Sequence, residues 1–230
     1  MLSLVKFYKW VNDGELEKMI KAVIFDFWGT LVENGTYSPI KQTYKTLNLR
    51  LSFGKFVEIF ERVFMTQSYP SQMDGLKKTI EAFNLTPKNF IVEKLIGIWN
   101  MNKLFAKPYS DVVPALEELK RKNIKIALVS NSPKDSTEYV LEKYKLSNLF
   151  DVVALSHNLK LLKTDKQMFE FIIGNLGVNK NEIVMIGDSL ETDMEAAQQS
   201  EIKGILMDRR NNREYQPKIK TLDELEKYIT

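Results

Sequence analysis

Two patterns of apolar residues follow one another along this chain and divide it into parts. Residues 22–27 (AVIFDF) form a short apolar run that includes an acid near its end, which is typical of a buried parallel strand. Residues 34–106 instead carry apolar residues at three- and four-residue spacing, which predicts helices. We expect these helices over residues 39–48, 53–67, 75–83 and 89–105.

After Ser110, short apolar runs alternate with helical segments. Strands are expected over 124–130, 151–155, 182–188 and 202–208. Helices are expected over 134–145, 165–176, 192–200 and 221–229. This alternation indicates an α/β fold with a doubly wound parallel sheet, in which ligands bind at the carboxyl ends of the strands. We therefore predict an α/β core from residues 19–33 and 107–230, with a helical domain inserted at 34–106.

Composition and charge exclude several classes of function. The 33 basic and 30 acidic residues give a net charge of +3, which is too balanced to favour nucleic acid or a membrane surface as a partner. The chain has no cysteine, which excludes disulfides and cysteine nucleophiles and fits a cytoplasmic protein. No apolar run approaches the ~20 residues that a membrane span needs.

Residues 1–18 precede the patterned part of the chain and are expected to be an N-terminal extension. Lys6 and Lys9 interrupt their apolar residues and no small-residue cleavage site follows, so the segment is a poor signal peptide. Two interpretations stay open: a short amphipathic helix packed on the domain, or a natural start at Met19.

Four stretches place chemically active side chains at or just after the ends of predicted elements. They are DFWGTL (26–31), VSNS (129–132), KTDKQMF (163–169) and GDSLETD (187–193). Asp26 can act as a nucleophile on phosphorus or carbon and form a covalent aspartyl intermediate. Asp26 and Asp188 offer the hard oxygen ligands that suit Mg²⁺. Ser130, Asn131 and Lys163 would hold the transferring oxygens through hydrogen bonds and positive charge.

In this order, the four stretches resemble the haloacid dehalogenase-like hydrolase superfamily. Its usual pattern is DxDGT after the first strand, Ser or Thr followed by Asn after another, a Lys often in KPDPxxF, and GDSxxxD after a later strand. The resemblance begins at about residue 20 and implies a Rossmann-like core with a helical cap at 34–106. It also implies the backbone carbonyl of Trp28 as a metal ligand, Asp193 as a further ligand or an acid behind the ligands, and Thr30 as the residue that orders the nucleophile loop.

Trp28 departs from the family pattern, because phosphatases of this family usually carry aspartate at its position. That aspartate protonates the leaving alkoxide and then activates water, and an indole N–H does neither. General acid–base catalysis is commonly worth ~10²–10⁴ in rate, so we expect poor turnover of alkyl phosphates unless another residue substitutes. Glu33, Glu191 and residues of the cap are conceivable substitutes, and nothing in the sequence singles one out.

Three functions remain open, and a Mg²⁺-dependent phosphatase that forms an aspartyl phosphate on Asp26 and acts on a small phosphate ester is favoured. The first alternative is a 2-haloacid dehalogenase, because a halide leaves without a proton and family dehalogenases often carry an aromatic residue at the position of Trp28. Such dehalogenases work without metal, however, whereas Asp26, Asp188 and Asp193 would crowd three carboxylates into one crevice. The second alternative is a catalytically weak protein that keeps the fold for binding.

Several other residues carry structural expectations. His157, the only histidine, is expected in a loop or on the surface without a role. Asn123 tolerates the left-handed conformation that often ends a helix, whereas Glu201 does not suit it and should follow a different helix ending. Tyr37 and Tyr69 are candidates to face the substrate. The core of the cap is expected to contain Phe53, Phe56, Phe60, Phe64, Phe83, Phe90 and Trp99.

Overall fold

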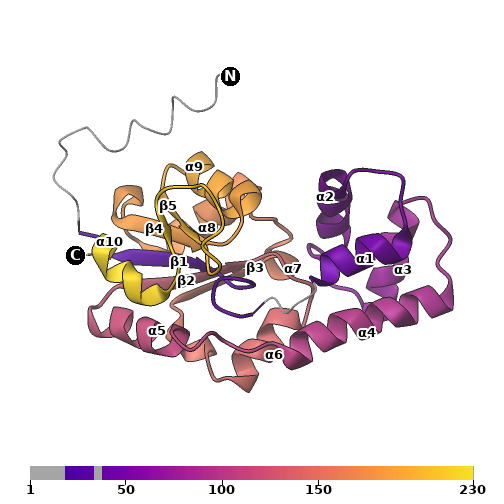
Figure 1. Ribbon diagram of the computed structural model, residues 1–230, viewed down its shortest axis with the longest axis horizontal. Helices are drawn as coiled ribbons and strands as arrows, with labels where there is room; N and C mark the ends of the chain where they lie inside the picture. Colours follow the sequence, from indigo (N-terminus) through magenta and orange to yellow (C-terminus); the bar gives the residue numbers. More distant parts are fainter. Residues whose placement is uncertain (1–18, 34–37, 230) are drawn as a thin grey trace.

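The structure, a computed structural model, describes residues 19–33 and 38–229, and in this part of the chain it contains a six-stranded parallel sheet (Figure 1). In spatial order the strands are β3 (Val152–Leu155), β2 (Lys125–Ser130), β1 (Ala22–Asp26), β4 (Ile183–Gly187), β5 (Lys203–Met207) and β6 (Lys218–Ile219). The predicted α/β fold is confirmed. Strand β6 has only two residues, too few to show a pattern of its own. Residues 1–18 and Tyr37, which carried expectations, lie outside the described residues.

Helices cover both faces of the sheet, because successive residues of a strand point to opposite sides. Val23 and Phe25 of β1 pack toward one face, and Ala22 and Ile24 toward the other. The helices of the first face are α5 (Val112–Arg121), α6 (Ser136–Lys143) and α10 (Glu226–Ile229). Those of the second are α8 (Lys166–Leu176) and α9 (Glu195–Gln199), and the short α7 (Ser156–Leu159) follows β3.

Residues 38–106 form a second lobe, called here the helical insert, between β1 and α5 (Figure 1). Its helices are α1 (Pro39–Leu47), α2 (Phe53–Phe64), α3 (Gln72–Ala82) and α4 (Asn89–Phe105). An apolar core of its own is centred on the rings of Phe56, Phe60, Phe64 and Trp99. Phe53 and Phe90 are exposed, so their predicted place in this core is wrong.

The chain enters and leaves the helical insert side by side. Val32 pairs with Pro108 in an antiparallel bridge, and the amide of Glu33 donates to the carbonyl of Lys107 at 2.9 Å. This short stem directly follows the loop after β1. The insert is therefore anchored next to the strand end that carries Asp26.

Two further structural expectations from the sequence are wrong. His157 lies in α7 and is buried. Both of its ring nitrogens have partners: Nδ1 lies 3.1 Å from the carbonyl oxygen of Ser132, and Nε2 lies 2.6 Å from Glu138. Glu201 does adopt the left-handed conformation (φ 60°) after α9, and its carboxylate pairs with Lys180 at 2.9 Å. Asn123 is left-handed, as predicted.

Across residues 19–33 and 38–229, no helix combines the length and the apolar character that crossing a membrane would require.

Candidate active site

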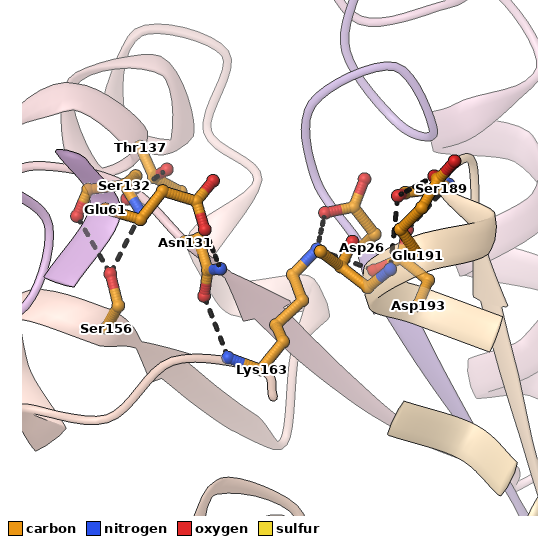
Figure 2. Close-up of polar contacts among 11 residues, drawn as sticks. Asp26, Glu61, Asn131, Ser132, Thr137, Ser156, Lys163, Ser189, Glu191 and Asp193 are labelled. Carbon is orange, nitrogen blue, oxygen red and sulfur yellow. Dashed lines mark hydrogen bonds and ion pairs between the residues drawn. The ribbon is translucent and has the colours of Figure 1, made fainter. Parts of the chain in front are cut away.

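Asp26 is the last residue of β1, and its buried carboxylate lies at the carboxyl end of the sheet (Figure 2). One oxygen, Oδ1, accepts a hydrogen bond from Nζ of Lys163. The other, Oδ2, is buried and has no hydrogen-bond partner among the described residues. Leaving a carboxylate oxygen buried and unpaired is costly, so this atom points to a cation or a ligand as its partner.

Lys163 is the buried cation at the centre of the site. Its Nζ donates to Asp26 and, at 2.7 Å, to Asp193 Oδ1. Burial opposes the charge of Lys163, but the carboxylates of Asp193 and Asp26 outweigh that effect and hold its pKa above the usual range. The second oxygen of Asp193 accepts from the amide of Ser189 at 3.0 Å. Asp193 therefore fixes the position of Lys163.

Asp26, Asp188 and Asp193 each bring a carboxylate oxygen within 4.8 Å of the others. Burial, together with the charges of Asp193 and Asp188, raises the pKa of Asp26 to about 8 despite the opposing effect of Lys163. Burial and then the charge of Asp193 raise the pKa of Asp188 to about 6. A divalent cation would relieve this repulsion, and these oxygens are the donor set that Mg²⁺ prefers. Asp26 Oδ2 and the Asp188 carboxylate fit such an ion best, because both oxygens of Asp193 already accept hydrogen bonds.

Arg213 is a second cation near this cluster, and the sequence analysis missed it. One guanidinium nitrogen donates to the backbone carbonyl of Asp188, and the other lies 4.0 Å from its carboxylate. Arg213 belongs to the loop RRNNREYQ (209–216), whose many charges single out no arginine. One lysine and this half-exposed arginine face three carboxyl groups, so the cluster carries an excess of negative charge whenever all three are ionised.

The predicted phosphate-binding residues lie at the same end of the sheet. Ser130 is the last residue of β2, and its hydroxyl is buried without a hydrogen-bond partner within the described ranges. The side chain of Asn131 is already engaged: its Oδ1 accepts from the amide of Lys163, and its Nδ2 donates to Glu61, each at 2.9 Å. Asn131 therefore connects the Lys163 loop to the helical insert.

Trp28 and Thr30 lie in the loop after β1. The half-buried indole of Trp28 meets Phe27 edge-on, with ring centroids 5.2 Å apart, and packs against the core. The hydroxyl of Thr30 is buried and has no partner in the part of the chain that is described, while its carbonyl accepts from Arg209 at 2.7 Å. Gly29 between them takes a left-handed conformation (φ 89°), which glycine adopts without strain.

Helix α2 holds the helical insert against the site. Glu61 accepts from Asn131, and Arg62 binds Asp165 through hydrogen bonds of 2.5 and 2.7 Å. Asp165 lies two residues after Lys163 in the chain. The insert is thus tied to the loop that carries the buried cation. Glu61 was missed from the sequence because an acid in FGKFVEIFERVF looks like any other charged position of an amphipathic helix.

A family model described as haloacid dehalogenase-like hydrolase matches residues 20–201. The chain belongs to the haloacid dehalogenase-like hydrolases. This hydrolase is 23% identical over 188 residues to the glyceraldehyde 3-phosphate phosphatase of Methanocaldococcus jannaschii, spanning 79% of this chain and 82% of that protein. It is 22% identical over 180 residues to (S)-2-haloacid dehalogenase 4A of Burkholderia cepacia, spanning 74% and 75%. The crystal structure of a HAD phosphatase from Thermococcus onnurineus matches it with a TM-score of 0.60 and 28% identity, over 90% of this chain and 97% of that one.

The predicted family is therefore confirmed, and the relatives of this hydrolase include both a phosphatase and a dehalogenase. Low identity to either kind does not decide between them. The chemistry has to be argued from the residues of the site.

Gly187→Ala is expected to displace Asp193 and so to loosen Lys163. A Cβ at Gly187 would overlap the Asp193 carboxylate. Overpacking of this kind typically costs about 1–3 kcal/mol, and the free energy of unfolding measured in urea should fall by that amount. Gly174→Ala in α8 is the control, because nothing lies within 4 Å of its added Cβ, and it should keep or raise stability. Equal stability of the two variants would contradict this close contact.

Proposed function

We propose that this hydrolase is a Mg²⁺-dependent phosphatase that forms an aspartyl phosphate on Asp26 and acts on a small phosphate ester. The observation that supports this most is the cluster of Asp26, Asp188 and Asp193 around the unpaired Oδ2 of Asp26. Asp26 must be ionised to attack, and the three carboxylates then repel an anionic substrate unless a cation lies between them. When bound, Mg²⁺ would supply that positive charge to the nucleophile and the phosphoryl oxygens.

The residues of the chain then have distinct roles in the proposal. A carboxylate oxygen of Asp26 attacks phosphorus as the bond to the leaving oxygen breaks, and water later hydrolyses the aspartyl phosphate. The ammonium of Lys163, kept in place by Asp193, and the hydroxyl of Ser130 stabilise the transferring oxygens. Trp28 packs against the core beside them and offers no proton.

A 2-haloacid dehalogenase is the second candidate, and Trp28 is the observation that favours it. Carbon–halogen cleavage needs no general acid, so the indole would do no harm there. The carboxylate of a 2-haloacid, however, would approach the same three acids. Dehalogenation does not use a metal ion, so nothing in that reaction would offset the negative charge of these acids. A protein that binds metal and ligand without turnover is the third candidate, and the buried nucleophile–lysine pair counts against it.

Hydrolysis of p-nitrophenyl phosphate tests the proposed function. The good leaving group of this ester needs little help from a general acid, so Trp28 should not prevent the step that releases nitrophenol. We expect Mg²⁺-dependent release of nitrophenol that EDTA abolishes. Halide release from 2-chloropropionate in EDTA, with no nitrophenol release in Mg²⁺, would instead establish the dehalogenase. Mg²⁺ binding without either activity would support the third candidate.

Mg²⁺ affinity is expected to rise between about pH 6 and pH 8. Without metal, the raised pKa values of about 8 for Asp26 and about 6 for Asp188 keep protons on this pair that Mg²⁺ must displace. Raising the pH removes those protons and strengthens binding. Titration calorimetry at pH 7 in two buffers of different ionisation enthalpy should detect proton release. Affinity that stays flat over this range, with no protons released, would contradict the proposed ligands.

A further inference from the structure

One carboxyl group beside the site comes from the helical insert, and the steps above do not use it. Glu61 of α2 is partly exposed, and its Oε2 accepts a hydrogen bond of 2.9 Å from Asn131. Asn131 in turn accepts from the amide of Lys163, whose Nζ reaches Asp26. Figure 2 shows Glu61, Asn131, Lys163 and Asp26 following one another across the site. Glu61 therefore lies at the insert end of a series of contacts that leads to Asp26.

The other acids near the site are less suited to give a proton to a leaving group. Both oxygens of Asp193 accept hydrogen bonds, and Asp188 belongs to the proposed metal site. Glu33 and Glu191, the two candidates named from the sequence, are exposed. Glu61 combines a hydrogen bond to a site residue with a side chain that is neither fully buried nor fully exposed.

We propose that Glu61 is the proton donor to the leaving group, in place of the aspartate whose position Trp28 occupies; this inference rests on the phosphatase function proposed above. As an Asp26 oxygen bonds to phosphorus, the bond to the leaving oxygen breaks. The electron pair of that bond takes the proton of the Glu61 carboxyl and the alcohol departs. The Glu61 carboxylate then takes a proton from the water that attacks the aspartyl phosphate. Inorganic phosphate, the Asp26 carboxylate and protonated Glu61 result.

The surroundings of Glu61 suit a group that changes its protonation during turnover. Burial raises its pKa above the ordinary value, and the charge of Asp193 adds to this. The hydrogen bond from Asn131 and the charges of Lys163 and Arg62 act in the opposite direction and do not cancel the effect of burial. A raised pKa keeps a larger share of the carboxyl protonated near neutral pH, as a general acid requires.

The dependence of the rate on the leaving group tests this role. Glu61→Gln keeps an oxygen that can accept from Asn131, so the fold should persist, with thermal unfolding as the check. In a single turnover with Mg²⁺, we expect this variant to release nitrophenol from p-nitrophenyl phosphate within about threefold of the wild-type rate, but glycerol from glycerol 2-phosphate about 10²–10⁴-fold more slowly. Later turnovers should slow on both esters, because the variant also lacks the carboxylate that takes a proton from the attacking water. Glu61→Asp, which retains a carboxyl group, should recover part of the second activity. The matched control is Glu58→Gln, one turn earlier in α2, whose exposed carboxylate pairs with Lys55 at 2.9 Å and whose loss should change neither rate.

A pH profile adds a readout that a structural role would not move. The wild-type kcat on glycerol 2-phosphate should fall at high pH as Glu61 loses its proton, and this limb should be absent in Glu61→Gln. Equal losses on the two esters in the single turnover would overturn the proposal and make Glu61 a positioning residue for Asn131. No loss on either ester would overturn it as well. If wild type shows no Mg²⁺-dependent turnover of p-nitrophenyl phosphate, the proposed function itself is wrong and the role of Glu61 fails with it.

Discussion

Asp26→Asn is expected to lower Mg²⁺-dependent turnover of p-nitrophenyl phosphate by about 10³-fold or more. The asparagine is nearly isosteric and its oxygen can still accept from Lys163, so the site should keep its shape. An amide oxygen is a poor nucleophile, however, and it forms no aspartyl phosphate. Steady-state kinetics with saturating Mg²⁺ measure the loss, with the exposed Asp223→Asn as a control that should retain the wild-type rate. Turnover within about tenfold of wild type would contradict the assignment of the nucleophile.

The same substitution should stabilise the metal-free protein as the pH rises. The folded pKa of Asp26, about 8, lies above its ordinary value of 3.8, so between these values the folded protein holds a proton that the unfolded chain releases. The stability linked to this carboxyl is fully present below about pH 4 and is lost as the pH rises through 8. Because asparagine does not titrate, Asp26→Asn should exceed wild type by about 1 kcal/mol or more at pH 8 in EDTA. Urea unfolding curves that keep the same separation at pH 5 and pH 8 would argue against a raised pKa.

Lys163→Met is expected to lower the free energy of unfolding by about 3–5 kcal/mol at pH 8 in EDTA. The reason is that Asp26 and Asp193 would stay buried without their shared cation. The loss should shrink as the pH falls, because the Asp26 carboxyl, whose pKa is already raised, can then bind a proton instead. Added Mg²⁺ should recover part of the stability at pH 8.

Lys166→Met provides the matched control for this substitution. Lys166 begins α8 three residues later, is exposed, and faces Glu170 at 3.4 Å. An exposed ion pair of this kind contributes little, so the control should lose less than about 1 kcal/mol. A loss as small as this in Lys163→Met would show that the site does not depend on a buried cation.

The first five strands and their order along the chain could be predicted because each lies within a mostly apolar run. The run 22–27 contains β1 (Ala22–Asp26), which is buried on both faces, and the runs that follow form parallel strands of the same sheet. The prediction failed where structure depends on contacts between distant residues. The four-residue α7 shows no periodicity, and the buried ring of His157 is paired there with Ser132 and Glu138, 25 and 19 residues earlier in the chain.

In the candidate site, too, the residues at strand ends could be predicted from the sequence and those placed by distant contacts could not. Asp26 and Ser130 end strands, and Asp188 follows one, so the rule for parallel sheets was enough to bring them together. Glu61 comes from a helix of the insert and Arg213 from a charged loop. The spacing of residues in these segments does not indicate which side chains point toward the site. How an inserted lobe packs on a core is set by side-chain contacts far apart in the chain, and one sequence does not reveal these.

Whether Asp26 becomes phosphorylated is the most direct test of the proposed chemistry. Turnover of p-nitrophenyl phosphate in Mg²⁺ would be stopped with acid, and the peptide that contains Asp26 would be weighed by mass spectrometry. We predict a peptide heavier by one phosphoryl group, absent in EDTA and in Asp26→Asn. Repeating the reaction in heavy-oxygen water should label the released phosphate and leave the Asp26 carboxylate unlabelled, because water attacks phosphorus. Turnover without phosphoryl on this peptide, or heavy oxygen in Asp26 itself, would contradict the mechanism.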